Sequence, residues 1–175
     1  MDTGLVHVYC GDGKGKTTAS LGLTMRCAGH GGHILFAQFL KGRPTGELKM
    51  LDLLPGVTVL RGQGITKFTF QMTADEKASV RQEHGMLFAQ ICQACQEEAL
   101  DMVVLDEVIG ACNTGLFDEE ALIGFLRDKP PSLEVVLTGR DPSPQLLDMA
   151  DYVSEICKRK HPFDRGVAGR DGIEQ

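Results

Sequence analysis

The chain has 175 residues, of which 42% are hydrophobic and 24% charged, and its formal net charge is −6. This length and composition are ordinary for one globular domain, and an acidic chain is a poor candidate for binding a polyanion such as DNA. No apolar run approaches the ~18 residues of a membrane helix, and the first residues lack the features of a secretory signal. We therefore expect a cytoplasmic protein with no nucleic-acid and no membrane partner.

The first third of the chain alternates short β-rich runs with helical segments. Strands are expected at residues 5–9, 33–40 and 57–61, and helices at residues 16–28 and 47–54. A cluster of glycines ends the first helix, and Pro55 with Gly56 ends the second, because both residue types interrupt regular structure.

The remaining two thirds continue the alternation after an irregular, aromatic segment at residues 63–71. Thr73 and Glu76 have the spacing of a capping box, in which both side chains satisfy free backbone amides, and they open the longest expected helix, to about residue 99. Further strands are expected at residues 102–105, 133–137 and 152–157, and further helices from Asp118 to residue 128 and near residues 145–150.

Strand–helix alternation from end to end implies right-handed crossovers and a parallel sheet. The expected fold class is α/β, a single P-loop (RecA-like) domain covering residues 1–175. Its sheet should be mostly parallel, of about six strands, with helices on both faces. Residues 158–175 are expected to form an irregular C-terminal segment.

Residues 9–18, YCGDGKGKTT, follow the phosphate-binding pattern G-x-x-x-x-G-K-[ST] with one departure. Gly15, Lys16 and Thr17 fit the end of the pattern, but Cys10 stands where the first glycine is expected. The expected strand leads into this loop and the expected helix follows it, so backbone amides and the positive end of the helix would point at phosphate oxygens. Lys16 would add a charge and Thr17 a hydroxyl for Mg²⁺. The segment predicts a nucleotide-binding loop rather than only a tight turn.

Two carboxylates, Asp106 and Glu107, end the apolar run LDMVVLDE. A buried strand would place them at the carboxyl edge of the sheet, where ligands of α/β proteins bind. Beside a triphosphate they would hold Mg²⁺ directly or through water. The alternative is a pair of exposed acids where the chain leaves the core.

Two further features keep two interpretations each. Arg140 follows the expected strand in VVLTGR, at the same carboxyl edge of the sheet. It would either contact phosphate or ribose there or form part of a structural turn. Phe68 and Phe70 lie in the irregular segment, as core anchors or as an apolar wall for a large flat ligand.

Cys92 and Cys95 form one C-x-x-C pair on the longest expected helix. A structural zinc site usually needs two such pairs, and the sequence has no second one. The sequence therefore favours core packing for these cysteines over metal or redox chemistry.

Together the motifs resemble those of the ATP:corrinoid adenosyltransferases, which attach the adenosyl group to the cobalt of vitamin B12 and its precursors. The resemblance extends from Leu5 to Glu174. It rests on GDGKGKTTASLGLTMRCAGHG, AQFLKGRPTGE, DMVVLDE, VVLTGR, LLDMADYVSEI and KHPFDRGVAGRDGIE, in this order. The last segment is the most specific, since ordinary P-loop ATPases do not share it.

This resemblance implies transfer of the 5′-deoxyadenosyl group from ATP to cobalt(I), with release of intact triphosphate. ATP would lie reversed, its γ-phosphate where other P-loop proteins hold the α-phosphate. The implied ATP-binding residues are Gly11, Asp12, Gly13, Lys14, Gly15, Lys16, Thr17, Thr18 and Arg140. Lys16, Lys14 and Glu107 would be catalytic, and Thr17, Glu107 and Asp106 would hold Mg²⁺ or Mn²⁺.

For the corrinoid, the resemblance implies that Phe68 and Phe70 displace the lower cobalt ligand and that residues 158–175 contribute to the site. It also implies a homodimer, with a flavoprotein as possible reductant. The alternative is a conventional P-loop NTPase or nucleoside kinase that attacks the γ-phosphorus and releases ADP. A nucleotide-dependent DNA-binding module is a second alternative, which the acidic balance disfavours.

Overall fold

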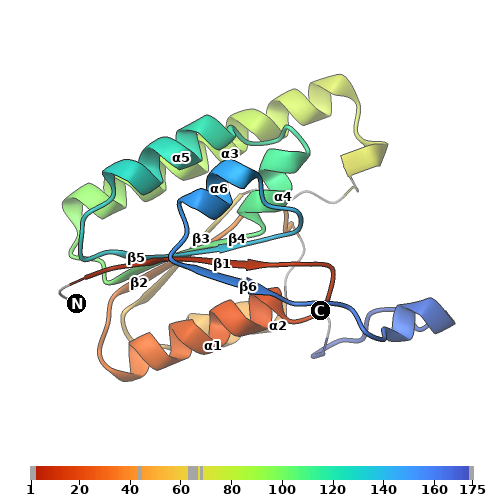
Figure 1. Ribbon diagram of the computed structural model, residues 1–175, viewed down its shortest axis with the longest axis horizontal. Coiled ribbons are helices and arrows are strands. Elements are labelled where there is room, and N and C mark those ends of the chain that lie inside the picture. Colours follow the sequence, from red (N-terminus) through yellow and green to blue (C-terminus); the bar gives the residue numbers. More distant parts are fainter. Residues whose placement is uncertain (1–2, 43–44, 63–66, 68, 174–175) are drawn as a thin grey trace.

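The computed structural model describes residues 3–42, 45–62, 67 and 69–173. These residues form one six-stranded sheet with the order β3-β2-β4-β5-β1-β6, in which every neighbouring pair is parallel (Figure 1). The strands are β1 (Val6–Cys10), β2 (Ile34–Gln38), β3 (Val57–Arg61), β4 (Met102–Asp106), β5 (Glu134–Thr138) and β6 (Tyr152–Glu155). The predicted α/β class and parallel sheet are confirmed.

Helices cover both faces of the sheet, as predicted. Helices α1 and α2 lie on one face, and α3 to α6 lie on the other (Figure 1). Their bounds are α1 (Lys16–Gly29), α2 (Gly46–Leu51), α3 (Ala74–Glu97), α4 (Val108–Asn113), α5 (Glu119–Asp128) and α6 (Pro144–Asp148). Two 3₁₀ turns, η1 (Thr69–Gln71) and η2 (Pro162–Arg165), complete the secondary structure. None of the helices in the described ranges combines the length and apolar character needed to cross a bilayer.

The burial of the central strands explains why they could be recognised in the sequence as apolar runs. Every residue of β2 and β4 is buried, because both faces of these strands are covered. β6 lies at the edge of the sheet beside β1, and all four of its residues are exposed, Tyr152 and Val153 to 50% each. All strands run in one direction, so the loops after β1, β2, β4 and β5 meet at one carboxyl edge.

Helix starts follow the expected caps. The Thr73 side chain accepts a hydrogen bond from the Glu76 amide, and the Glu76 carboxylate accepts one from the Thr73 amide, which confirms the capping box of α3. Asp118 caps α5 by accepting from the Glu120 amide. Helix α4 was not predicted: it has six residues, includes Gly110, and begins without a side-chain cap. It forms because burial of Val108 and its neighbours against the sheet outweighs weak local propensity.

The cysteines of α3 belong to the core, as the sequence favoured. Cys95 is buried in the cluster between α3 and the sheet, and Cys92 packs against that cluster. Burial raises the pKa of Cys95 to about 11, so its thiol stays protonated and unreactive near neutral pH. Across the described residues, no group of three or more His, Cys, Asp or Glu side chains could hold a metal ion.

We expect Ellman's reagent at pH 8 to react first with the exposed Cys157 and not with Cys95 or Cys112, whose pKa burial raises to about 12. Replacing Cys157 by Ser should remove the fast phase. Unfolded thiols ionise near pH 9.0, below the pKa of either folded thiol, so their contribution to stability is full below pH 9.0. It is lost as pH rises through about 11 for Cys95 and about 12 for Cys112. Rapid labelling of Cys95 in the folded protein would contradict this packing.

Candidate nucleotide and metal site

The glycine loop joins β1 to α1 and packs against the chain that follows β6. The Gly13 amide donates to the Ile156 carbonyl at 2.7 Å, and the Ile156 amide donates to the Cys10 carbonyl at 2.8 Å. A Cβ atom at Gly11 or Gly13 would lie 2.5 or 2.6 Å from the Ile156 oxygen. The displaced glycine therefore has a structural reason. Cys10 is the buried last residue of β1, and the glycines stand where the loop crosses Ile156.

Lys16 is the buried cation of the loop. Its Nζ donates to the carbonyls of Gly11 and Gly13 at 2.7 and 2.8 Å, and the residue is 8% exposed. Burial lowers the pKa of Lys16, while the charge of Glu107 acts in the opposite direction. Because, among the described residues, only main-chain carbonyls hold this ammonium, a phosphate oxygen can replace them as its partner with a gain in charge pairing.

The other side chains of the loop lie closer to solvent. Lys14 and Thr18 are exposed. The Asp12 carboxylate accepts from the Lys158 amide at 2.8 Å, a bond that lowers the pKa of Asp12. The start of the C-terminal segment is thus tied to the loop at two points, through Asp12 and through the contact of Ile156 with Gly13.

Asp106 organises the carboxyl edge beneath the loop. It ends β4 with no exposed surface, and its Oδ1 accepts from the Thr17 hydroxyl at 2.9 Å and from the Thr138 hydroxyl at 2.8 Å. Thr138 ends β5, which lies between β1 and β4 and so bridges the loop strand to the acidic strand. The Thr138 hydroxyl also accepts from the Glu107 amide at 2.9 Å.

The second oxygen of Asp106 faces a cation that follows β2. Lys41 Nζ lies 2.8 Å from Asp106 Oδ2, 3.2 Å from Thr17 Oγ1 and 3.6 Å from Glu47 Oε1. Sequence reasoning missed both Lys41 and Thr138. The available signal was their position, since each follows or ends a buried strand within a family motif, FLKG or VVLTG.

Glu107 has an unusual backbone. It directly follows β4 and caps α4 with φ 61°, a left-handed conformation that non-glycine residues adopt at a cost. Burial raises the pKa of Glu107, and the neighbouring Asp106 raises it further, while Lys41, Lys16 and Arg140 oppose the shift. Among the described residues its carboxylate has no hydrogen-bond or ion-pair partner. A half-buried carboxylate that is repelled by its neighbour and held in a strained turn favours the approach of a cation.

Arg140 lies at the same edge, after β5. Its carbonyl accepts from the Asn113 side chain at 2.8 Å, which fixes the main chain, while the side chain is exposed. The positive charge of Arg140 lowers the pKa of both Lys16 and Glu107, so the guanidinium lies near the loop. Both interpretations of Arg140 therefore remain supported. Its backbone forms a structural turn, and its charge acts on the candidate phosphate site.

The oxygen groups at this edge fit a magnesium ion. Thr17, Asp106 and Glu107 offer a hydroxyl and two carboxylates, hard oxygen donors of the kind Mg²⁺ takes, and the ion usually adds phosphate oxygens and water to few protein ligands. The fully buried Asp106 already holds a cation, Lys41, at 2.8 Å, which shows that the position attracts positive charge.

The fold brings the predicted loop residues, Asp106, Glu107 and Arg140 to one edge. It does not test the aromatic pair. Phe68 lies outside the described residues, and Phe70 falls in η1 with a side chain that the structure does not describe.

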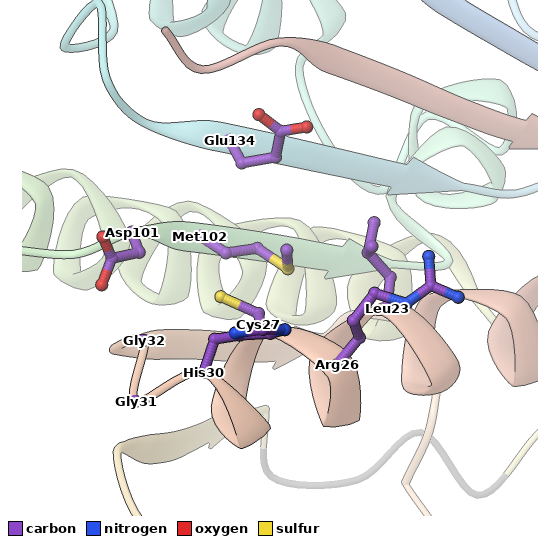
Figure 2. A pocket seen from close by; sticks show the side chains of 9 residues that line it. All are labelled: Leu23, Arg26, Cys27, His30, Gly31, Gly32, Asp101, Met102 and Glu134. Atoms are coloured by element: carbon purple, nitrogen blue, oxygen red, sulfur yellow. The ribbon is translucent and has the colours of Figure 1, made fainter. Parts of the chain in front are cut away.

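A pocket of about 510 Å³ lies at the opposite, amino-terminal edge of the sheet (Figure 2). It is lined by the end of α1 and the starts of β4 and β5, including Cys27, Asp101 and Glu134. Both carboxylates already bond to the chain itself: Asp101 accepts from the His33 amide at 2.9 Å, and Glu134 pairs with His7. This pocket is therefore separate from the phosphate loop.

Comparison with known proteins agrees with this geometry. The chain matches the family described as ATP:corrinoid adenosyltransferase BtuR/CobO/CobP over residues 2–175. It is 35% identical to the corrinoid adenosyltransferase CobA of Salmonella typhimurium and 34% identical to the corrinoid adenosyltransferase of Escherichia coli K12, covering 99% of this chain and 86% of each relative.

A similar solved structure is the EccC protein (ATPases 2 and 3) of Thermomonospora curvata, with a TM-score of 0.52 and 18% identity over 91% of this chain and 32% of that one. That likeness concerns the fold alone. The family match spans the loop, the acidic strand and the C-terminal segment together, and the sequence identity extends over nearly the whole length. On these grounds the chain belongs to the ATP:corrinoid adenosyltransferases and is an enzyme of that activity, with ATP and a corrinoid as its substrates.

Proposed function

We propose that this enzyme binds the whole triphosphate of ATP in the glycine loop, so that it leaves as one unit when cobalt(I) bonds to C5′ of the ribose. The observation that carries the proposal is Lys16, a buried ammonium that donates to two loop carbonyls and to no other group in the described part of the chain. In the reaction the Co–C bond forms with the cobalt electron pair, and the C5′–O bond breaks with its pair going to triphosphate. The nucleophile carries no proton, so no protein base is required.

The protein contributes alignment and charge. Holding two reactants in line can supply about 7–11 kcal/mol of the barrier. Lys16, the exposed Lys14 and the loop amides would neutralise the charge that grows on the leaving oxygen. A magnesium or manganese ion would add positive charge there when bound. Thr17 and Glu107 are its proposed direct ligands, with Asp106 in reach of a bound water.

The corrinoid would lie beside the loop at the carboxyl edge. Residues 158–175 are proposed to contribute to this site, a role that fits the hydrogen bond from the Lys158 amide to Asp12. The segment exposes Phe163 to 72%, apolar surface of the kind that a large flat ring can cover. The aromatic pair Phe68 and Phe70 is proposed to favour the four-coordinate cobalt by displacing its lower ligand.

Three further proposals are not carried by the geometry: the first two follow from the family resemblance and the third from the sequence features given above. The enzyme is proposed to be a homodimer, to accept electrons for cobalt from a reducing flavoprotein, and to act in the cytoplasm. Size-exclusion chromatography with light scattering, reconstitution with a purified flavoprotein and cell fractionation test them in turn.

The reaction is tested by anaerobic incubation of the protein with ATP, Mg²⁺ and chemically reduced corrinoid. We expect a light-sensitive cobalt–carbon product together with one equivalent of inorganic triphosphate. Release of ADP and orthophosphate instead would favour the alternative, a conventional P-loop NTPase or kinase.

Replacing Phe70 by Ala should separate reduction from transfer. We expect a loss of about tenfold or more when cobalt(II) corrinoid is supplied with a biological reductant, because removing the ring removes the apolar wall proposed to disfavour the lower ligand. The same variant should retain most of its activity when cobalt(I) is generated chemically. Equal losses in the two assays would sink this role for Phe70.

A further inference from the structure

Lys41 stands where a metal ion would have to bind. Its Nζ lies 3.2 Å from Thr17 Oγ1, proposed above as a direct ligand of Mg²⁺, and 2.8 Å from Asp106 Oδ2, on the carboxylate proposed to lie in reach of a metal-bound water. We propose that Lys41 is a resident counter-ion: it occupies the metal position while no nucleotide is bound, and it moves to Glu47 when Mg²⁺ enters with ATP. This inference deepens the proposed function and rests on its assignment of the metal site.

The hydrogen-bond directions show why the two cations compete. The Thr17 hydroxyl donates its single proton to Asp106 Oδ1 at 2.9 Å, so its oxygen lone pairs are what Lys41 contacts. A metal ion bound to Thr17 needs one of the same lone pairs. Two positive charges at that separation repel strongly in a partly buried site, and the ammonium must therefore leave before the metal can bind.

Asp106 requires a counter-ion in every state. It has no exposed surface, and a buried carboxylate without a paired charge is strongly unfavourable. Its Oδ1 is occupied by the hydroxyls of Thr17 and Thr138. Its Oδ2 lies beside the Lys41 ammonium and accepts no other hydrogen bond from the described residues. Lys41 thus preserves the charge balance of the site until the metal replaces it.

Glu47 gives the displaced ammonium a second position. It lies in the first turn of α2, and its Oε1 is already 3.6 Å from Lys41 Nζ. Burial disfavours the charged carboxylate, but hydrogen bonds, including one from Gln38, and the charge of Lys41 together lower the pKa of Glu47. The Lys41 main chain is fixed, because its amide donates to the Phe39 carbonyl and its carbonyl accepts from Arg61. Only the side chain has to turn.

The test measures Mn²⁺ binding to the full chain without nucleotide, by electron paramagnetic resonance. In Lys41→Met we expect Mn²⁺ to bind at least about tenfold more tightly than in wild type, since the competing cation is gone and Asp106 lacks its charged partner. Lys41→Arg keeps the charge and should bind Mn²⁺ as wild type does. Lys49→Met removes an exposed lysine of α2 and serves as the matched control, also without effect.

Glu47→Gln should act in the opposite direction and covers the case in which Lys41→Met does not fold. Without its second position the ammonium stays on Asp106, so we expect Mn²⁺ affinity to fall several-fold. In the double variant with Lys41→Met the Glu47 substitution should have no effect, because it acts through Lys41. Three outcomes would each overturn the proposal. They are unchanged or weaker Mn²⁺ binding in Lys41→Met, tighter Mn²⁺ binding in Lys41→Arg, and a Glu47→Gln effect that persists in the double variant. The measurement involves no corrinoid, so it is separate from failure of the adenosyl-transfer reaction.

Discussion

Replacing Lys16 by Met is expected to lower kcat/KM for adenosyl transfer by about 10²–10³-fold, the typical effect of removing one donor that stabilises developing negative charge. The substitution keeps most of the length of the side chain but removes the ammonium that contacts the carbonyls of Gly11 and Gly13. Because burial disfavours that charge in the ligand-free protein, the loss should not arise from unfolding. Steady-state kinetics and a thermal melt of the same preparation check both parts.

Two comparison variants make the result specific. Lys14→Met removes the exposed cation of the loop and should cost less, about tenfold, since an exposed charge is screened by water. Lys49→Met lies outside the loop in α2 and should retain the wild-type rate. Wild-type activity in Lys16→Met would remove Lys16 from the site and with it the main support for the triphosphate assignment.

Gly13→Ala is the second substitution expected to have a large effect. The added Cβ would lie 2.6 Å from the Ile156 oxygen and 2.9 Å from the Cys157 carbonyl carbon, both main-chain atoms that cannot rotate away. The loop or the chain after β6 must shift, which strains the Gly13–Ile156 hydrogen bond and the carbonyl that Lys16 contacts. We expect a loss of about 1–3 kcal/mol in the free energy of unfolding, the usual cost of overpacking. A shift of this kind should also weaken ATP binding by about tenfold or more.

Gly22→Ala is the matched control, because a Cβ there meets nothing within 4 Å and the residue lies inside α1. It should increase stability by about 0.5–1 kcal/mol, since alanine favours helix over glycine. Chemical denaturation and calorimetric titration with ATP measure the two effects. If Gly13→Ala matched Gly22→Ala in both measurements, the contact with Ile156 would not constrain the loop.

The helices and strands were predictable because burial and helix capping require particular residue types at fixed positions in the sequence. Strands covered on both faces, such as β2 and β4, are continuous apolar runs, and the caps of α3 and α5 lie at fixed offsets from their helices. Helix α4 has no such pattern, because six residues show little periodicity. It begins after Glu107, whose backbone is left-handed and whose side chain does not cap the helix.

The site was predictable only in part, for a different reason. The loop and the two acids stand in recognisable motifs, but contacts between distant segments do not. Lys41 and Thr138 meet Asp106 only because β2, β4 and β5 are neighbours in the sheet. The departure at Cys10 is explained by Ile156, more than a hundred residues away along the chain. Pairing across the sheet, rather than local pattern, decides such roles.

The position of β1 has a consequence for biosynthesis. Both of its neighbours, β5 and β6, come from the last third of the chain, and the loop it carries rests on Ile156. During translation β1 therefore waits for both partners until the ribosome has passed β6, more than 140 residues further along the chain. A nascent chain that stops before Ile156 lacks the surface against which the loop packs, so ATP binding requires synthesis beyond Ile156 and is not an early step of folding.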